Sequence, residues 1–420
     1  MPFKKHDRQY DLVVFGATGY TGKYTSQSIT RDLPTDLRWA IAGRSRGKLE
    51  KLAEELKSLN PDRLAPEIEI CELNDEDLAS LARKTFVLIT TVGPYGQYGE
   101  HAFKACAQNG THYLDVTGEV PYVAKMIKKY ESVAKKTGSM LFPQTGVESA
   151  PADLLTWALA KQIRQKFEGA KTAEAIVSIH RLNSSPSGGT LATLISFNDM
   201  FSLKEIGAAL TPYALSPVPN PQAKHQKQSL WSMITGLRTV PELGLQTTFI
   251  GATTDRAIVH RSWGLFQQIS SRKDEFYGPQ FRFSQHMKTR NWLTGIAIHW
   301  TIITATILLT VLSPLRKLVK RFVYEQGQGP DFEEAKKEEI EYRAVGMPEG
   351  INGELAYCQA AFRGSMYDLT GVILAQSALT ILEDDLDLGG GVFTPACLGQ
   401  GVIDRLDASG FRFETKTLTR

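Results

Sequence analysis

This chain of 420 residues has few cysteines and a small net charge. The four cysteines lie far apart, and no pair has the short spacing of a zinc site or a disulfide framework. Lys and Arg number 48 against 45 Asp and Glu, so the net charge is only +3 and no nucleic-acid partner is expected. The opening MPFKKHDRQYDLVVFG lacks the apolar stretch of a signal peptide. We therefore expect a chain that starts in the cytosol.

Several signatures of other enzyme classes are missing as well. No cluster of metal-ligating residues is evident, so no metal is predicted, and no serine-hydrolase elbow is present. The Tyr-x-x-x-Lys pattern of short-chain dehydrogenases does not follow the expected strand. What remains is a chain with 42% hydrophobic and 22% charged residues, which is typical of a globular protein of two or three domains.

The first motif is a glycine turn, DLVVFGATGYTG, at residues 11–22. An apolar run ends in Gly-x-x-Gly-x-x-Gly, which predicts a strand, a tight turn and the start of a helix. Glycines let the backbone amides of the helix N-terminus approach a pyrophosphate, whose charge the helix dipole favours. The predicted contacts are Gly16, Thr18, Gly19, Tyr20, Thr21 and Gly22. The alternative is a plain strand-to-helix turn in which glycines only allow close packing.

The second motif lies at the end of the next predicted strand, residues 37–43, where Arg44 and Ser45 follow. A site for NAD needs an acidic residue there to bind the ribose 2′-hydroxyl. A guanidinium instead suits a 2′-phosphate through charge-assisted contacts, so Arg44 favours NADP. The alternative is an ordinary solvated arginine.

Strands predicted at 68–73, 86–92, 111–118 and 139–143 alternate with helices. This alternation predicts an α/β fold with a Rossmann-type doubly wound parallel sheet. Ligands of such sheets bind beyond the carboxyl ends of the strands. The predicted neighbours of the nicotinamide there are Thr91, Val92, Gly93 and Pro94. Tyr95 and Tyr98, just beyond, are candidate proton donors, with an aromatic shelf or simple packing as the alternative.

The regular alternation weakens after residue 150. We expect a nucleotide domain at 1–150, a second α+β domain at 151–345 and a C-terminal segment at 346–420. Residues 187–190 (SGGT) are candidates for the substrate cleft or for an ordinary loop. Residues 216–228 are expected to form an exposed loop, and 332–344, with mixed charges, a solvated helix.

The segment 291–315 has 25 positions without Asp, Glu, Lys or Arg, long enough to cross a bilayer. Trp292 and Trp300 suit a membrane interface, and the basic RKLVKR that follows suits anionic headgroups. We expect membrane contact, with a buried helix or a dimer interface as the alternative.

Several stretches carry a family resemblance: GATGYTG, AGRS followed by KL, TTVGPYGQYGEHAFKACAQNGTHYLDVTGE, GVESAPADL, SGGT and GGGVFTPACLGQGVIDRLDASGFRFE. Together they resemble the saccharopine dehydrogenase-like oxidoreductases and the trans-acting enoyl reductases, over nearly the whole chain. Such proteins often have GFDS where this chain has GVES, with Glu148 at the acidic position.

The resemblance implies that the second domain closes over the nicotinamide and that a helix near 366–383 packs back on the nucleotide domain. Both ends of the apolar segment then lie on one side, which favours a re-entrant or interfacial helix over a full crossing. Some similar proteins associate with lipid droplets or other membranes. A membrane-associated protein facing the cytosol, on a lipid droplet or the endoplasmic reticulum, is therefore expected.

Together these features predict an NADPH-dependent oxidoreductase that reduces an enoyl-type C=C bond of a lipid-like, acyl or polyketide-like substrate. Two alternatives stay open: a membrane-tethered NADPH-binding scaffold or redox sensor without turnover, and a saccharopine-type imine reductase. Homodimer formation is left open too.

Overall fold

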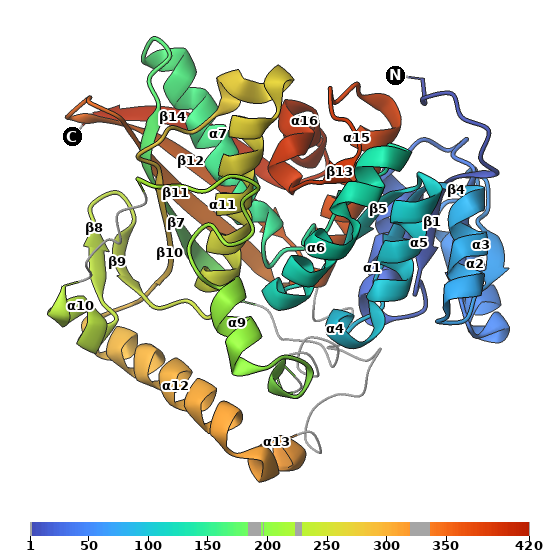
Figure 1. The fold of residues 1–420 in the computed structure, drawn as a ribbon, viewed down its shortest axis with the longest axis horizontal. Helices are drawn as coiled ribbons and strands as arrows, with labels where there is room; N and C mark the ends of the chain where they lie inside the picture. The colour runs from blue at the N-terminus through green and yellow to red at the C-terminus, as the bar shows by residue number, and fades with distance from the viewer. Residues whose placement is uncertain (1, 184–194, 196, 223–228, 320–336, 420) are drawn as a thin grey trace.

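The computed structural model describes residues 2–183, 195, 197–222, 229–319 and 337–419, which build two sheets of seven strands each, side by side (Figure 1). The predicted segment 187–190 lies outside the described residues, as do parts of the expected loop at 216–228 and of the expected helix at 332–344.

The first sheet is the predicted parallel one. Its strand order is β13-β6-β5-β4-β1-β2-β3, and every pairing is parallel. β1 is fully buried because each of its residues lies between two helical layers. The elements in chain order are β1 (Tyr10–Phe15), α1 (Tyr20–Asp32), β2 (Trp39–Gly43), α2 (Arg46–Leu59), β3 (Glu67–Ile70), α3 (Asp75–Lys84), β4 (Thr85–Thr90), α4 (Tyr95–Tyr98), α5 (Glu100–Asn109), β5 (His112–Asp115), α6 (Val120–Thr137) and β6 (Met140–Phe142).

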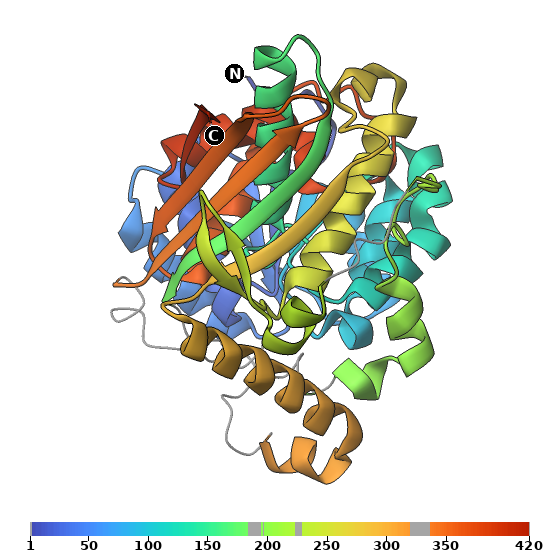
Figure 2. The same cartoon turned by 90° about the vertical axis from the view of Figure 1, so that its left-hand side faces the viewer.

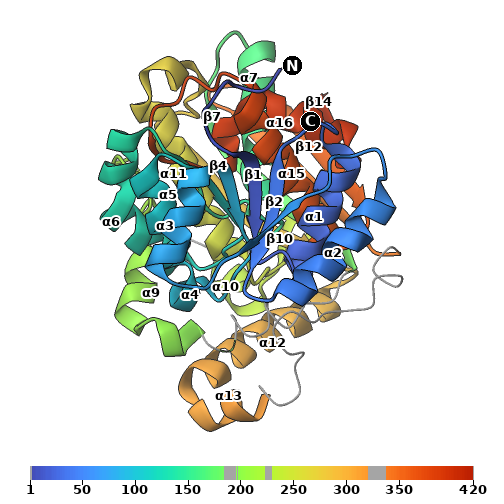
Figure 3. The same cartoon turned by 90° about the vertical axis from the view of Figure 1, so that its right-hand side faces the viewer.

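Helices cover both faces of this sheet. Figure 3 shows α3, α5 and α6 on one side and α1, α2 and α15 (Met366–Glu383) on the other. A Cβ atom on Gly371 of α15 would lie 2.7 Å from the Tyr24 carbonyl oxygen of α1, so the two helices are in close contact. The C-terminal segment also supplies β13 (Gly391–Val392), which extends the parallel sheet beside β6.

The second sheet has the order β14-β12-β11-β7-β10-β9-β8. Only β7 and β10 run parallel; the other neighbours are antiparallel. Helices α7 (Ala150–Lys166) and α11 (Ala252–Gln268) lie on the face toward the first sheet, and none of the described helices covers the face turned to the viewer in Figure 2. Its strands are β7 (Thr172–Asn183), β8 (Arg238–Val240), β9 (Gly244–Thr247), β10 (Arg282–Lys288), β11 (Glu339–Pro348), β12 (Glu354–Arg363) and β14 (Arg412–Thr419).

The α/β class with a second sheet domain is confirmed. The predicted helix at 332–344 is wrong from Glu339 onward, because β11 begins there and pairs with β7 and β12. Ile340, Tyr342 and Ala344 alternate into the core, a strand period that the surrounding charges conceal in the sequence. The predicted boundary between residues 345 and 346 also falls inside this strand.

The apolar segment forms one helix, α12 (Trp292–Val311), followed by α13 (Ser313–Val319). By length and composition alone α12 could cross a membrane, with a mean hydropathy of 1.7. Only Gly295 and His299 of this helix are buried, so α12 is not a core helix of the part of the chain that the structure describes. Figure 2 shows α12 and α13 projecting below the body of the molecule.

Candidate functional site

The predicted site residues come from loops at the carboxyl ends of the parallel strands. The structure gathers the loops after β1, β2, β4, β5 and β6 along one edge of the first sheet. In Figure 1 this edge, marked by α4, is turned toward α9 (Leu203–Ala209), α12 and α13. Ligands of doubly wound sheets bind along this edge.

The glycine turn has the geometry of an anion cradle. Gly16 has a left-handed φ of +83°, and a Cβ atom there would lie 2.6 Å from Val92 Cγ2. A Cβ atom on Gly22 would lie 2.3 Å from the Gly16 carbonyl oxygen, so the helix approaches the turn at backbone contact. Gly19 begins α1 without a side-chain cap, and the first turn of α1 contains no acidic residue. The amides of this turn are therefore suited to a pyrophosphate.

The three side chains of this turn differ in their surroundings. Thr18 and Thr21 are partly exposed beside the uncapped amides. The ring of Tyr20 instead packs against Tyr24 and Tyr367, with ring centroids 5.4 and 4.9 Å away. Tyr20 is thus positioned to offer a ligand its backbone amide rather than its side chain.

Arg44 directly follows β2 and is exposed. No hydrogen bond or ion pair engages its guanidinium within the described part of the chain. The neighbouring Arg46, in contrast, lies 3.8 Å from the Glu50 carboxylate one turn along α2. A free cation and no acidic side chain at this strand end fit a 2′-phosphate. Ser45, at the start of α2, leaves its hydroxyl free of any capping bond.

The loop after β4 supports the glycine turn. The Thr91 hydroxyl donates to the carbonyl oxygens of Gly16 at 3.2 Å and Phe15 at 3.4 Å. Val92 packs on Gly16, and a cis peptide joins Gly93 to Pro94. This loop is partly exposed from Thr91 to Gly93, where the nicotinamide half of a dinucleotide is predicted.

The two candidate proton donors differ sharply. Tyr95 is buried, and its hydroxyl donates to the Thr90 carbonyl oxygen at 2.9 Å. Burial raises the pKa of Tyr95 well above its ordinary value. This geometry gives Tyr95 a packing role, as in the alternative considered above, because its proton is already used inside the protein. Tyr98 is partly exposed and stays a predicted donor.

Two glutamates join this edge: Glu119, which follows the predicted strand at 111–118, and Glu148 of the GVES motif. Glu119 accepts hydrogen bonds from the amides of Tyr95 (2.7 Å) and Gly96 (2.6 Å), and so caps α4. Burial raises its pKa to about 7. Glu148 reaches solvent, and its Oε2 lies 2.5 Å from where a Cβ atom of Gly118 would stand. The protein that surrounds Glu148 raises its pKa as well.

Beside Glu148 lies a small set of buried polar groups from both halves of the molecule. Ser149 Oγ, Asp255 Oδ1 and both amide atoms of Gln285 form no hydrogen bond of good geometry with the described residues, although Ser149 and Gln285 lie beside Asp255. Burial, and then the charge of Glu148, raise the pKa of Asp255 well above its ordinary value. Buried polar atoms that lack a well-formed hydrogen bond within the protein are usually paired with a water molecule or a ligand.

Sequence reasoning missed Asp255 and Gln285 because they lie on α11 and β10, far from any motif. The arrangement joins an anion cradle, a free guanidinium and a patch of weakly acidic side chains. It can hold a dinucleotide by its phosphates and place carboxyl groups beside a polar atom of a second ligand.

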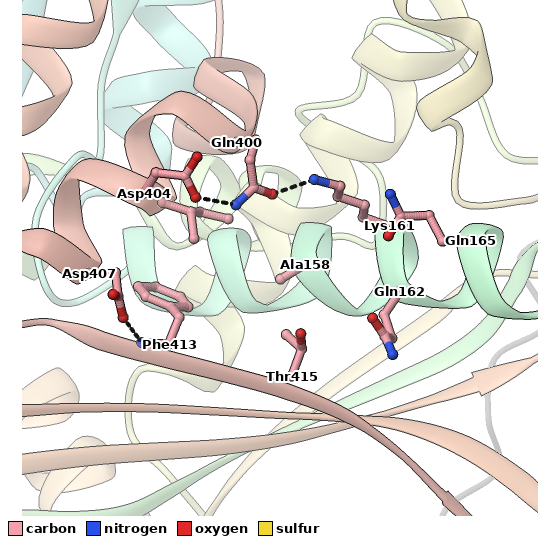
Figure 4. Close-up of a pocket in the computed structure, with 10 residues that line it drawn as sticks. Ala158, Lys161, Gln162, Gln165, Gln400, Asp404, Asp407, Phe413 and Thr415 are labelled. Atoms are coloured by element: carbon pink, nitrogen blue, oxygen red, sulfur yellow. Dashed lines mark hydrogen bonds between the residues drawn. The ribbon is translucent and has the colours of Figure 1, made fainter.

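A separate pocket of about 430 Å³ lies between α7, α16 (Gly399–Ala408) and β14 (Figure 4). There Lys161 donates to Gln400 at 2.6 Å, and Gln400 donates to Asp404 at 2.7 Å. None of its lining residues comes from the strand-end loops of the first sheet, so it does not belong to the nucleotide site. No group of three metal-ligating side chains occurs within the described ranges.

Comparison with known proteins agrees with this geometry. Residues 12–142 match the model of the saccharopine dehydrogenase NADP binding domain. A trans-acting enoyl reductase of Mycobacterium ulcerans is 30% identical over 419 residues, covering 96% of this chain and 97% of the relative. A saccharopine dehydrogenase-like oxidoreductase of Rattus norvegicus is 28% identical, covering 97% of both chains.

Among solved structures, saccharopine dehydrogenase (L-Glu forming) from Saccharomyces cerevisiae superposes with a TM-score of 0.56 and 12% identity. The match covers 97% of this chain and 99% of that one, and it shows the fold alone. The chain belongs to the family of saccharopine dehydrogenase-like oxidoreductases and trans-acting enoyl reductases, and its cofactor is NADP.

Proposed function

We propose that this protein is an NADPH-dependent reductase of an activated C=C bond in a lipid-like, acyl or polyketide-like substrate. The observation that carries the proposal is the uncapped glycine turn with Arg44 on the same sheet edge as Glu119 and Glu148. The name of the relative from Mycobacterium ulcerans supports the enoyl class.

The amides of the glycine turn would hold the phosphates of NADPH, and Arg44 would orient its adenosine half. The bound cofactor would supply the hydride that the β-carbon of an enoyl thioester needs. A proton must then reach the α-carbon of the substrate, so that the C=C bond becomes a C–C bond with two new C–H bonds. Two side chains at this edge can hold that proton: Tyr98, which is partly exposed, and Glu148, which is exposed.

The test is NADPH consumption by the purified protein with an α,β-unsaturated acyl thioester, with the saturated thioester as control. The proposal predicts that NADPH is consumed only with the unsaturated compound, and that a product heavier by two hydrogens accumulates. Tight NADPH binding without consumption across a range of enoyl chain lengths would favour the scaffold or redox sensor.

The imine-reductase alternative is less compatible with the site. An amino-acid imine carries carboxylates, which need cationic partners. The side chains gathered beyond the glycine turn are instead acidic, namely Glu119, Glu148 and Asp255. Carboxyl groups, whether protonated or ionised, offer a substrate carboxylate no cationic partner.

The proposal extends to a membrane surface as the partner, on the cytosolic face of a lipid droplet or the endoplasmic reticulum. α12 is held to the body near both ends: Thr247 donates to the Gly295 carbonyl oxygen at 2.7 Å, and Asn198 donates to the Thr310 hydroxyl at 3.3 Å. A helix held in this way lies along a surface rather than across a bilayer. Whether the chain forms a homodimer stays a prediction.

A further inference from the structure

We propose that α10 (Leu230–Thr235) is a second membrane-inserting element, which together with α12 forms one rigid lipid-docking face. This inference rests on the membrane part of the proposed function and adds an element that the sequence did not single out. We define the lipid face by Leu230, Trp231, Met233 and Ile234 of α10 and by Trp292 and Trp300 of α12.

The apolar side chains of α10 face solvent. Trp231 is 69% exposed and Ile234 61%, and Leu230 and Met233 are exposed as well. A six-residue helix with four exposed large apolar side chains gains nothing from folding in water, since its apolar area stays hydrated. Insertion into lipid would bury these side chains and supply the hydrophobic free energy that folding in water does not.

The tryptophans of the chain divide cleanly. Trp39, Trp157 and Trp263 are buried in the core, whereas Trp231 of α10 and Trp292 and Trp300 of α12 are exposed. Tryptophan combines a large apolar ring with one N–H donor and concentrates where hydrocarbon meets water. The three exposed tryptophans therefore indicate how deep α10 and α12 would lie relative to the lipid headgroups.

α10 and α12 are fixed to each other. α10 ends at Gly236 in a left-handed conformation, where a Cβ atom would lie 2.4 Å from the His299 ring of α12. Nδ1 of His299 lies 2.7 Å from the Thr248 hydroxyl, just beyond β9. The two helices thus form one platform on the β8–β9 hairpin, side by side in Figures 1 and 2.

A lipid surface fits this face better than a second copy of the chain. Neither α10 nor α12 contains a charged residue, while Lys288 and Arg290 stand exposed at the edge, where anionic headgroups would meet them. The helices form a projecting ridge (Figure 2), which soft lipid accommodates without the matching groove that a protein partner would need.

Docking through this face sets the orientation of the nucleotide site. The strand-end edge of the first sheet is turned toward α12 (Figure 1). Asn198 contacts Thr310 of α12, and Phe201, a few residues on, lies 2.5 Å from where a Cβ atom of Gly96 in α4 would stand. An acyl chain leaving the lipid would therefore meet the site over a short path.

The test is co-sedimentation of the purified full chain with phosphatidylcholine vesicles, with and without phosphatidylserine, in the presence of NADPH. The variant Trp231→Ser/Ile234→Ser removes two exposed apolar side chains of α10. Leu59→Ser, on α2, removes a side chain that is 50% exposed on another part of the molecule. We expect vesicle binding to fall about tenfold or more in the α10 variant and to stay unchanged in Leu59→Ser.

Unchanged vesicle binding by the α10 variant would overturn the proposal. So would a wild-type chain that ignores vesicles and elutes as a dimer broken by the α10 substitutions, because the face would then bind a second copy. NADPH affinity is measured in parallel and should be equal in all variants. The reductase proposal is tested separately, by NADPH consumption with the unsaturated thioester, so its failure is distinguishable from a failure of lipid docking.

Discussion

At the scale of single residues, the glycine turn is the most sensitive point of the site. In Gly22→Ala the new methyl group would meet backbone atoms of Gly16 and Ala17, which cannot move aside as a side chain can. The helix must shift away from the turn and carry its amides with it. We predict a loss of NADPH affinity of about tenfold or more, measured by nicotinamide fluorescence titration.

Gly47→Ala is the matched control, because nothing lies within 4 Å of a Cβ atom on this residue of α2. Alanine should leave NADPH affinity unchanged and stabilise the helix by about 0.5–1 kcal/mol. Equal NADPH affinities for both alanine variants would mean that the turn is not the binding site.

Arg44 determines the choice between NADPH and NADH in this account. Arg44→Ala should lower the NADPH affinity by about tenfold to a hundredfold and leave the NADH affinity nearly unchanged, since only NADPH carries the 2′-phosphate. The measurement is paired titration with both nucleotides. Arg46→Ala, which removes a guanidinium already paired with Glu50, should change neither value.

His260 predicts a pH dependence of stability. Its Nδ1 accepts from the Tyr213 amide at 3.2 Å, and burial lowers its pKa to about 3. In the unfolded chain His260 has an ordinary pKa of about 6.5 and binds a proton more readily than in the folded protein. The contribution of neutral His260 to the free energy of unfolding is therefore lost as the pH falls from about 6.5 toward 3. Between pH 7 and 5 we expect the loss to reach about 2 kcal/mol.

The check is chemical denaturation of the wild type and of His260→Gln across this pH range. Glutamine can accept the same hydrogen bond but does not titrate. The stability advantage of the wild type over the variant should therefore shrink on acidification, and a constant difference would refute the assignment.

The backbone geometry of the glycine turn and the position of Arg44 after β2 were predictable from the sequence, because glycine spacing indicates where the backbone needs a left-handed φ or a close approach. The roles of side chains were less predictable. The hydroxyl of Tyr95 turns inward to Thr90, and Asp255 joins the edge from another domain. Neither fact has a local sequence signal, since both depend on tertiary packing.

At the scale of elements, the contact between α1 and α15 fastens the C-terminal segment to the nucleotide domain. In Gly371→Ala the added methyl group would lie 2.7 Å from the Tyr24 carbonyl oxygen. The two helices must separate, which should cost about 1–3 kcal/mol of unfolding free energy and lower the melting temperature. Thermal unfolding measures this.

Gly207→Ala in α9 is the control, because a Cβ atom there meets nothing within 4 Å. It should unfold at or above the wild-type temperature. If Gly371→Ala also kept the wild-type stability, the close packing of α1 on α15 would not hold in solution.

Most of the parallel sheet was predicted, because strands such as β1, β2 and β4 are short apolar runs between helices of clear period. Two strands were missed: β11 of the second sheet, where charged residues occupy alternate positions of the first half, and β13 of the parallel sheet, which is only two residues long. Their strand character comes from the neighbours they pair with, β7 and β12 for the first and β6 for the second.

At the scale of the whole molecule, three features lie on one side: a nucleotide edge, a buried polar patch with residues from both halves of the molecule, and an apolar platform. Each could occur alone in an unrelated protein. Their common orientation is what suggests a reductase that takes its substrate from a lipid surface.

The most direct test of this account is NADPH oxidation by the full chain with an α,β-unsaturated acyl thioester embedded in phosphatidylcholine vesicles. The account predicts oxidation that requires the unsaturated thioester and that falls in Arg44→Ala in proportion to its lost NADPH affinity. Tight NADPH binding with no oxidation under any of these conditions would contradict it.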